Sequence, residues 1–440
     1  MSIISGHAGD EGVQEIAADP GRRGTFRSLR VRNYRLFFAG QLVSVSGTWM
    51  QQVAVSWLVL TITGSGVDLG LAVALQFLPM LLFGMWGGLV ADRFDKRKVL
   101  VVAQAVPAVL AVGLWALVAS GSVELWMVYT LAFLGGLVSV IDMPARQAFV
   151  VEMVGPDDVP NAVALNSAMF NAGRLIGPAA AGVVISTAGV APAFLVNAVS
   201  YLVVIGALVA MRPHELFRDP AAEAAPRRQP GQIREGLRHV WHTPELRSPL
   251  LLLAVIGTFG FNFAVVLPLL ARYTFDGGPR MYGVLTGVVS LGSLLGALYT
   301  ASRSRPTRRR LVGSSIAFGA VTMGAAATRT PLTAALVLVA VGGTVMIFLA
   351  TANATLQLNS SPAMRGRVMA LYGLVFLGST PLGGPFLGFV SEHWGARAGL
   401  LVAGSASLAA GLAAWWVPAL RRRRVEAPAL RRTEPAGQAA

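Results

Sequence analysis

Long runs of hydrophobic residues follow one another along most of this chain, and short polar segments separate them. A run of about 20 apolar residues lets a helix cross a bilayer, because each residue adds about 1.5 Å to the helix length. The pattern predicts an all-α membrane protein. Its twelve transmembrane helices are expected at 34–60, 69–91, 97–119, 124–143, 162–187, 191–211, 248–271, 281–302, 310–328, 331–353, 367–390 and 396–418.

Composition supports a membrane location. Of the 440 residues, 54% are hydrophobic and 13% are charged, whereas soluble domains carry about 25% charged residues. A soluble protein with a large core is the alternative, and the recurring membrane-length runs argue against it. The net charge of +15 would suggest nucleic acid in a soluble protein. Here the basic residues lie between spans, so we expect no nucleic-acid partner.

Basic residues also predict the orientation, because Lys and Arg are retained on the cytoplasmic side. With the N-terminus inside, all but five of the 36 fall on predicted cytoplasmic segments. Arg174 lies inside a span, and the outer ones are Arg272, Arg280, Arg329 and Arg397. We expect a multi-pass protein of the bacterial cytoplasmic (inner) membrane with both termini in the cytoplasm. The first thirty residues lack the pattern of a signal peptide.

A long polar connection divides the spans six and six. Within it, the apolar spacing of residues 233–241 predicts a short helix on the inner membrane surface. Glycine-rich segments of the fifth and eleventh spans, and the segments before the first and seventh spans, recur about 205 to 213 residues apart, which indicates two pseudo-symmetric six-helix bundles. The expected regions are a cytoplasmic tail (1–33), an N-terminal half (34–211), a central loop with the interfacial helix (212–247), a C-terminal half (248–418) and a basic cytoplasmic tail (419–440).

The loop after the second span carries the clearest local motif. Gly88 would let another helix approach closely. Asp92 ends a helix, where the negative partial charge disfavours a carboxylate, so we expect it to face another helix N-terminus or an arginine. Arg93, Arg97 and Lys98 follow. A basic loop that only fixes topology is the alternative, but it does not account for Gly88 and Asp92.

This loop resembles the signature loop of the major facilitator superfamily. Further segments resemble the enterobactin-exporter-like branch, which is grouped with drug efflux carriers: 33–41, 76–79, 142–149 and 365–373. The resemblance implies that Asp92 latches the cytoplasmic gate near the start of the eleventh helix. Arg146, expected after the fourth span, is its candidate ion partner. The latch would form when the protein opens outward and break when it opens inward.

The fifth span contains a stripe of small residues at helical spacing, Gly173, Gly177 and Ala181, and a kink-forming Pro178. It resembles the glycine-proline motif of the superfamily's antiporters, which favours export by exchange. A tightly packed, bent helix is the alternative. Gly384 and Pro385 occupy the related place in the eleventh span, so we expect helix hinges at both places.

Arg174 is the most unusual residue of the chain, because an arginine inside a span usually faces a cavity or a partner. We expect it to bind an acidic substrate group; a structural hydrogen-bond hub is the alternative. Polar side chains of three spans are expected to line the same central cavity: Gln41, Thr48, Gln52, Asn171 and Asn262.

Proton coupling requires a group that gains and loses a proton. Asp142, expected near the inner end of the fourth span, is the candidate. Many drug antiporters of the superfamily carry an arginine within the fourth span, but residues 129–136 contain none. The alternative is that Asp142 only anchors the gate, together with Arg146.

The leading hypothesis is secondary active efflux of small amphipathic molecules, such as drugs, antibiotics or siderophores, by alternating access with proton antiport. We expect a monomer whose partners are its substrate, protons and the lipid bilayer. An enzyme is not expected, since a phosphate-binding loop is missing. No cofactor or metal is expected, and the absence of cysteine excludes thiolate sites. An uptake carrier, a lipid flippase and a non-transporting receptor or scaffold are the alternatives.

Overall fold

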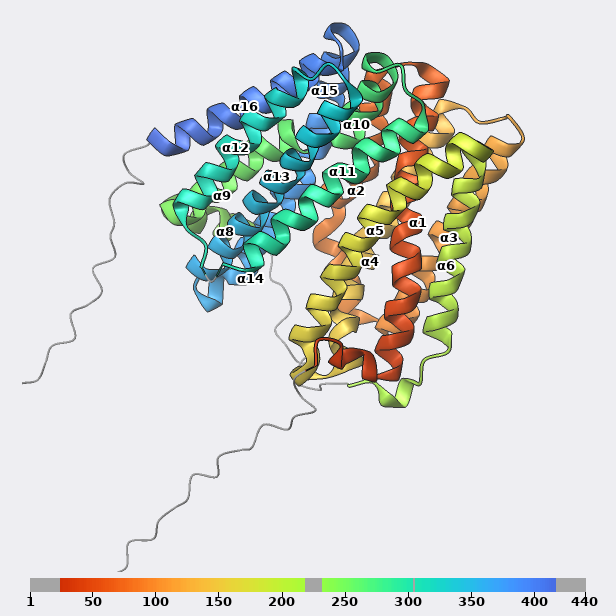
Figure 1. The fold of residues 1–440 in the computed structure, drawn as a ribbon. Coiled ribbons are helices and arrows are strands. Elements are labelled where there is room, and N and C mark those ends of the chain that lie inside the picture. Colours follow the sequence, from red (N-terminus) through yellow and green to blue (C-terminus); the bar gives the residue numbers. More distant parts are fainter. Residues whose placement is uncertain (1–23, 218–231, 304, 417–440) are drawn as a thin grey trace, which may run out of the picture.

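The computed structural model describes residues 24–217, 232–303 and 305–416, and this part of the chain is almost entirely helical (Figure 1). In the N-terminal half, a 3-10 turn at Arg27–Arg30 precedes the long helices. These are α1 (Arg32–Thr63), α2 (Gly66–Arg93), α3 (Lys96–Ala119), α4 (Leu125–Val154), α5 (Val159–Ala188) and α6 (Ala191–Val209). Further 3-10 turns lie at Pro156–Asp158 and Pro213–Glu215.

The C-terminal half begins with the short helix α8 (Gln232–His242), where the sequence predicts the interfacial helix. The seventh span is built in pieces: α9 (Pro244–Val255), the π-helix η5 (Ile256–Gly260), α10 (Phe263–Leu269) and the π-helix η6 (Leu270–Thr274). The remaining helices are α11 (Pro279–Ala301), α12 (Arg308–Ala326), α13 (Pro331–Asn359), α14 (Pro362–Gly378), α15 (Thr380–Trp394) and α16 (Ala396–Trp416). The eleventh span therefore consists of α14 and α15, joined at Ser379.

Ten of these helical segments are long and apolar enough to cross a membrane. The predicted first and ninth spans, α1 and α12, are not among them. Both carry polar residues, including Gln51 and Gln52 in α1 and the arginines 308–310 in α12. Both nevertheless pack among the other long helices of their halves, α1 against α5 and α6, and α12 against α13 and α16. The all-α membrane fold is confirmed, and ten helical segments of the described residues are candidate spans by their length and apolar composition.

Two features of the helices differ from the sequence prediction. The fourth helix continues to Val154 instead of ending at 143, because Phe149, Val150 and Met153 bury apolar side chains beyond that point. Arg146 consequently lies inside α4, one turn after Asp142, and not in a loop after the span. The seventh span, expected to be continuous, is interrupted at Phe261 and Asn262 between η5 and α10.

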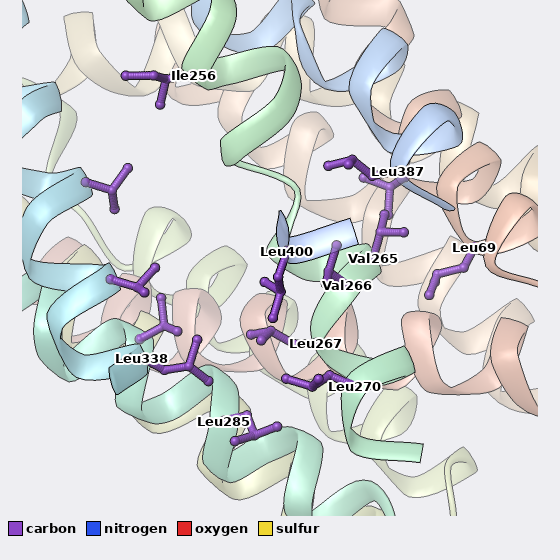
Figure 2. Close-up of a cluster of buried hydrophobic side chains, with 14 of the residues drawn as sticks. Leu69, Ile256, Val265, Val266, Leu267, Leu270, Leu285, Leu338, Leu387 and Leu400 are labelled. Carbon is purple, nitrogen blue, oxygen red and sulfur yellow. The ribbon is translucent and has the colours of Figure 1, made fainter. Parts of the chain in front are cut away.

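The two halves meet along two pairs of helices, α2 with α15 and α5 with α11. We call the end of the molecule that holds the α1–α2 turn the outer end, and the end that holds the α2–α3 connection the inner end. In Figure 1 the outer end is at the top, where the halves converge; toward the inner end they lean apart. One cluster of buried apolar side chains, including Leu69 of α2, Leu267 of α10 and Leu387 of α15, spans the two halves (Figure 2).

Glycines permit this contact between the halves. A Cβ added to Gly66 would lie 2.6 Å from the carbonyl oxygen of Gly388, and one on Gly70 would lie 2.4 Å from that of Gly384. On the other pair of helices, a Cβ on Gly283 of α11 would lie 2.6 Å from the carbonyl oxygen of Pro178. The backbones therefore touch directly, as small residues allow in membrane proteins.

The predicted small-residue stripe of α5 also packs closely, in this case against α1 of the same half. A Cβ on Gly173 would lie 2.6 Å from a methyl carbon of Val45. One on Gly177 would lie 2.5 Å from the carbonyl oxygen of Ser46. Pro178 lies inside α5, and Ala181 is fully buried.

We predict that Gly177→Val destabilises the protein by about 1–3 kcal/mol, because the added atoms meet backbone that cannot move aside locally. Gly113→Val in α3 is the matched control, since a Cβ there has no neighbour within 4 Å. Thermal unfolding of both variants in detergent measures the difference. Equal unfolding midpoints for the two variants would contradict the close packing of α1 and α5.

Candidate transport site

Arg174 lies about halfway along α5, at the junction of the two halves. Its guanidinium is 5.4 Å from the ring centre of Trp49 in α1 and 5.8 Å from that of Phe261, beside the break in the seventh span. Cations are attracted to the faces of aromatic rings at such distances. Trp49 belongs to the N-terminal half and Phe261 to the C-terminal half, so Arg174 contacts both halves at mid-height.

No hydrogen bond or ion pair to Arg174 is found among the described residues. An arginine at this depth normally has a carboxylate, a carbonyl or a water-filled cavity beside it. The two aromatic rings offset part of the cost of the charge but accept none of the five N–H groups of the guanidinium. Among the described residues, Arg174 therefore has cation–π contacts but no hydrogen-bond acceptor.

The polar side chains expected in one central cavity are distributed over separate places. Asn171, one turn before Arg174 on α5, donates to the carbonyl oxygen of Ser167 in its own helix (2.8 Å). Gln41 is buried and accepts a hydrogen bond from Arg146 of α4 (3.0 Å). These contacts lie within the N-terminal half.

Thr48 and Gln52 line a pocket of about 120 Å³ between α1, α2, α3, α4 and α6. Gln51, Gln76 and Tyr201 add polar groups to this pocket, and the Thr48 hydroxyl lies 3.4 Å from the Tyr201 hydroxyl. The two residues thus face the interior of their own half, while Trp49, next to Thr48, faces Arg174. Neighbouring positions on α1 thus point to different surfaces, and the structure places Thr48 and Gln52 at this pocket of the N-terminal half.

Asn262 marks the break in the seventh span. Its side-chain amide donates to the carbonyl oxygen of Thr258 (2.8 Å), while its buried Oδ1 has no hydrogen-bond partner among the described residues. A Cβ on Gly383 of α15 would lie 1.7 Å from that Thr258 oxygen, so this position holds only glycine. Sequence reasoning placed the hinges at Gly384 and Pro385; Gly384 contacts Gly70 of the other half, and Pro385 lies inside α15.

Asp142 belongs to a buried polar network of the N-terminal half. Its carboxylate pairs with Arg146, one turn later on α4, and accepts a hydrogen bond from Gln104 of α3 (2.8 Å). Arg146 also donates to Gln41 of α1, and its guanidinium lies 5.8 Å from the ring centre of Phe170 in α5. Charge pairing with additional hydrogen bonds is what allows two charged groups to remain buried. The network joins α1, α3 and α4.

The gate-loop residues whose side chains the structure describes do not form one cluster. The surroundings of Gly88 and the side chain of Asp92 lie outside the described part of the structure. Arg97 donates to the carbonyl oxygens of Leu208 (2.7 Å) and Val209 (2.9 Å), and so caps the C-terminus of α6. A cation is favourable at this negative end of a helix. Arg93 and Lys98 border a groove of about 650 Å³ between α3 and α4.

Residues that sequence reasoning missed connect the two halves at the outer end. Glu392 of α15 accepts hydrogen bonds from Ser65 (2.7 Å) and from the backbone N–H of Val67 (3.0 Å). Arg272 and Tyr273 of η6 donate to backbone carbonyl oxygens of Leu60 (2.7 Å) and Gly64 (2.9 Å). No local sequence motif distinguishes these positions, and by sequence Arg272 indicates only membrane topology.

No group of three or more His, Asp and Glu side chains suited to a metal ion occurs among the described residues. The structure instead contains three polar features. Arg174 lies between aromatic rings near the middle of the bundle, Asp142 and Arg146 form a buried ion pair in the N-terminal half, and hydrogen bonds join the two halves at the outer end. These are the parts expected of a carrier whose halves move against each other.

Comparison with known proteins agrees with this class. Residues 23–435 match the family of transmembrane secretion effectors of the major facilitator superfamily, and the chain belongs to this family. The match confirms the resemblance stated from the gate loop and from the exporter-like segments. It also places the chain in a family of transporters.

Several curated relatives are efflux or siderophore proteins. The chain is 29% identical over 397 residues to the multidrug efflux pump Tap of Mycolicibacterium fortuitum, covering 88% of this chain and 96% of the relative. It is 26% identical over 268 residues to the staphyloferrin A transporter of Staphylococcus aureus, covering 60% of this chain and 66% of the relative. It is 23% identical over 367 residues to macrolide efflux protein A of Streptococcus pyogenes, covering 80% of this chain and 89% of the relative.

Solved structures share the fold at low identity. A bacterial homologue of the human lysosomal transporter Spinster, in an inward-facing and occupied conformation, is 15% identical with a TM-score of 0.69; the match covers 89% of this chain and 97% of that one. The nucleoside transporter NupG is 12% identical with a TM-score of 0.67, covering 88% and 98%. These similarities establish the transporter fold.

Proposed function

We propose that this protein exports small amphipathic molecules across the bacterial inner membrane by alternating access. The observation that carries the proposal is Arg174, a cation with free donors that lies between aromatic rings of the two halves. A site shared by both halves near mid-membrane is accessible from one side at a time when the halves rock. The efflux proteins among the relatives support the outward direction.

The arrangement of the halves supports an inward-facing state. The hydrogen bonds that join described residues of the two halves lie at the outer end. The halves lean apart at the inner end (Figure 1). The distribution of basic residues supports an inner end in the cytoplasm, with both chain termini there. We further propose that the protein acts as a monomer in the lipid bilayer, without a cofactor or nucleic acid.

The environment of Arg174 supports substrates that combine an anionic group with an aromatic or apolar body. A guanidinium binds carboxylates through two parallel hydrogen bonds. Trp49 and Phe261 offer ring faces to the rest of the molecule. Asn171 lies in α5 with Arg174, and Asn262 is next to Phe261, so both are candidates for further polar contacts with the substrate. Gln41, Thr48 and Gln52 instead contact residues of the N-terminal half.

Transport by inside-out vesicles tests the proposal with three fluorescent compounds of one shape: pyrenebutyrate (anion), pyrenebutanol (neutral) and pyrenebutyltrimethylammonium (cation). An exporter accumulates its substrate in such vesicles. We predict that Arg174→Gln lowers pyrenebutyrate accumulation at least about tenfold, since the paired charge is lost. Pyrenebutanol accumulation should change little.

Arg329→Gln, which removes an exposed arginine at the outer end, is the matched control. Equal losses for all three compounds would assign Arg174 to structure and not to recognition. Accumulation only in right-side-out vesicles would favour the alternative, an uptake carrier.

We propose protons as the coupling ions, with Asp142 as the group that exchanges them. Its position in a polar network close to α1 and α3 supports access from the inner end, and Arg146 would stabilise the deprotonated state. In the same vesicles, a pH gradient should drive accumulation in the wild type, and Asp142→Asn should abolish the dependence on the gradient. A variant that keeps the gradient dependence would leave Asp142 as a structural partner of Arg146.

We also propose that Asp92 latches the inner gate in the outward-facing state, near the start of α14. In the inward-facing arrangement Arg146 pairs with Asp142, so a latch between Arg146 and Asp92 would require Arg146 to exchange partners. We expect Asp92→Asn to slow accumulation of every probe about two- to tenfold at unchanged protein level, because the latch stabilises only one of the two states. Transport at the wild-type rate would refute the latch.

A further inference from the structure

The outer end of the N-terminal half presents two helix termini side by side. Gly64 and Ser65 form the turn between α1 and α2, with Gly64 in the left-handed conformation at φ 68°. The last carbonyl groups of α1 and the first N–H groups of α2 lack the full set of partners that groups inside a helix have. The carbonyl oxygen of Leu60 accepts from the N–H of Gly64 (3.0 Å), the residue after the helix. The end of α1 is therefore partly negative and the start of α2 partly positive.

The C-terminal half supplies a cation to the negative end. Arg272 donates to the carbonyl oxygen of Leu60 (2.7 Å), and the Tyr273 hydroxyl donates to that of Gly64 (2.9 Å). Both residues belong to the π-helix η6, and the Arg272 guanidinium also lies 5.5 Å from the Tyr273 ring centre. A π-helical turn displaces the following side chains relative to an α-helix, and such turns often occur at functional positions.

The same half supplies an anion to the positive end. Glu392, in the last turn of α15, accepts from the Ser65 hydroxyl (2.7 Å) and from the backbone N–H of Val67 (3.0 Å). Ser65 is itself the N-cap of α2, since its oxygen accepts from the N–H of Asp68 (3.1 Å). Glu392 thus extends the cap of a helix that belongs to the other half.

The sign of each charge matches the helix end that it contacts. Two separate elements of the C-terminal half, η6 and α15, provide the two charges, and both contacts cross between the halves. The neighbouring seam between α2 and α15 is a backbone contact at Gly66 and Gly388, which contributes packing but no charge. The polar contacts at the helix ends are therefore distinct from the neighbouring backbone contact between Gly66 and Gly388.

These contacts are suited to break reversibly. Glu392 is exposed and Arg272 partly so, and water can satisfy exposed helix ends when the halves separate. Each exposed charge at a helix end shifts an equilibrium only by a small factor. Caps of this strength favour one conformation without locking it.

We propose that these contacts form a clasp that holds the outer gate closed in the inward-facing state. The outer clasp consists of Glu392 on Ser65 and Val67, and of Arg272 and Tyr273 on Leu60 and Gly64. It breaks when the protein opens outward, so its strength sets the balance between the two states. The equilibrium between the inward-facing and outward-facing states exists without substrate, so the clasp would act independently of the proposed export function.

Distances between spin labels across the outer end test the clasp in the full chain. The chain has no cysteine, so Ser122→Cys and Leu332→Cys provide the only labelling sites, one on the outer side of each half, and both positions are exposed. In lipid nanodiscs without substrate, Glu392→Gln and Arg272→Gln should each raise the ratio of the long to the short distance about two- to fivefold. The double variant should multiply the two effects, because the charges contact different helix ends.

Two variants serve as matched controls. Arg397→Gln removes an arginine that donates to the carbonyl oxygen of Thr328 at the end of α12 (2.8 Å), within one half. Glu124→Gln removes a carboxylate that accepts from Trp126 (2.7 Å), also within one half. Both should leave the distance ratio unchanged.

The clasp is refuted if Glu392→Gln and Arg272→Gln give the wild-type ratio, or if the controls shift it equally. Should either variant fail to fold, Tyr273→Phe removes a single hydroxyl and keeps the ring, and it should still raise the ratio by a smaller factor. An unchanged ratio in that variant would also count against the clasp. The distance measurement uses no substrate. A negative result in the vesicle transport assay would therefore not change the outcome of this test.

Discussion

Direct contact between glycine backbones joins the two halves, and the arrangement of the rest of the molecule depends on it. Within a bilayer, helices gain little from the hydrophobic effect, so they associate through close packing and hydrogen bonds. Gly70 with Gly384, and Pro178 with Gly283, bring α2 to α15 and α5 to α11 at backbone distance. Since these contacts lie toward the outer end, the halves can lean apart at the inner end (Figure 1).

Polar side chains inside the bundles differ in whether a protein partner neutralises them, and this difference separates structural from functional positions. Asp142 and Arg146 neutralise each other, and Gln104 and Gln41 satisfy further hydrogen bonds of the pair. Arg174 has only two aromatic ring faces among the described residues. Because an unpaired cation in a membrane is costly, this contrast points to Arg174 as the place where a substrate supplies the missing group.

Helix ends provide a second means of joining the halves. At the inner end of the N-terminal half, Arg97 caps α6 within that half. At the outer end, Arg272 and Glu392 cap helices of the opposite half. The same interaction therefore stabilises a bundle in one place and connects two bundles in another. The outcome depends on whether the capping residue belongs to the same half as the helix or to the other half.

The periodic pattern predicted the helices well, because apolar length is a local property of the sequence. It missed the end of α4, where the helix continues beyond the membrane-length run, and the break at Asn262, where Thr258 packs directly on Gly383 of α15. The site was predicted in part. Arg174 stands out because a charge within an apolar run is visible in one dimension, whereas the pocket that Thr48 and Gln52 line depends on how five helices pack.

The membrane class, the family and the unusual arginine can be recognised from the amino-acid sequence, since each is encoded in runs, spacings or short motifs. The three-dimensional packing is needed to know which glycines touch and which helix ends meet residues more than 200 positions away. Those contacts depend on the relative placement of the two halves. Placement results from packing between distant segments, and no local pattern records it.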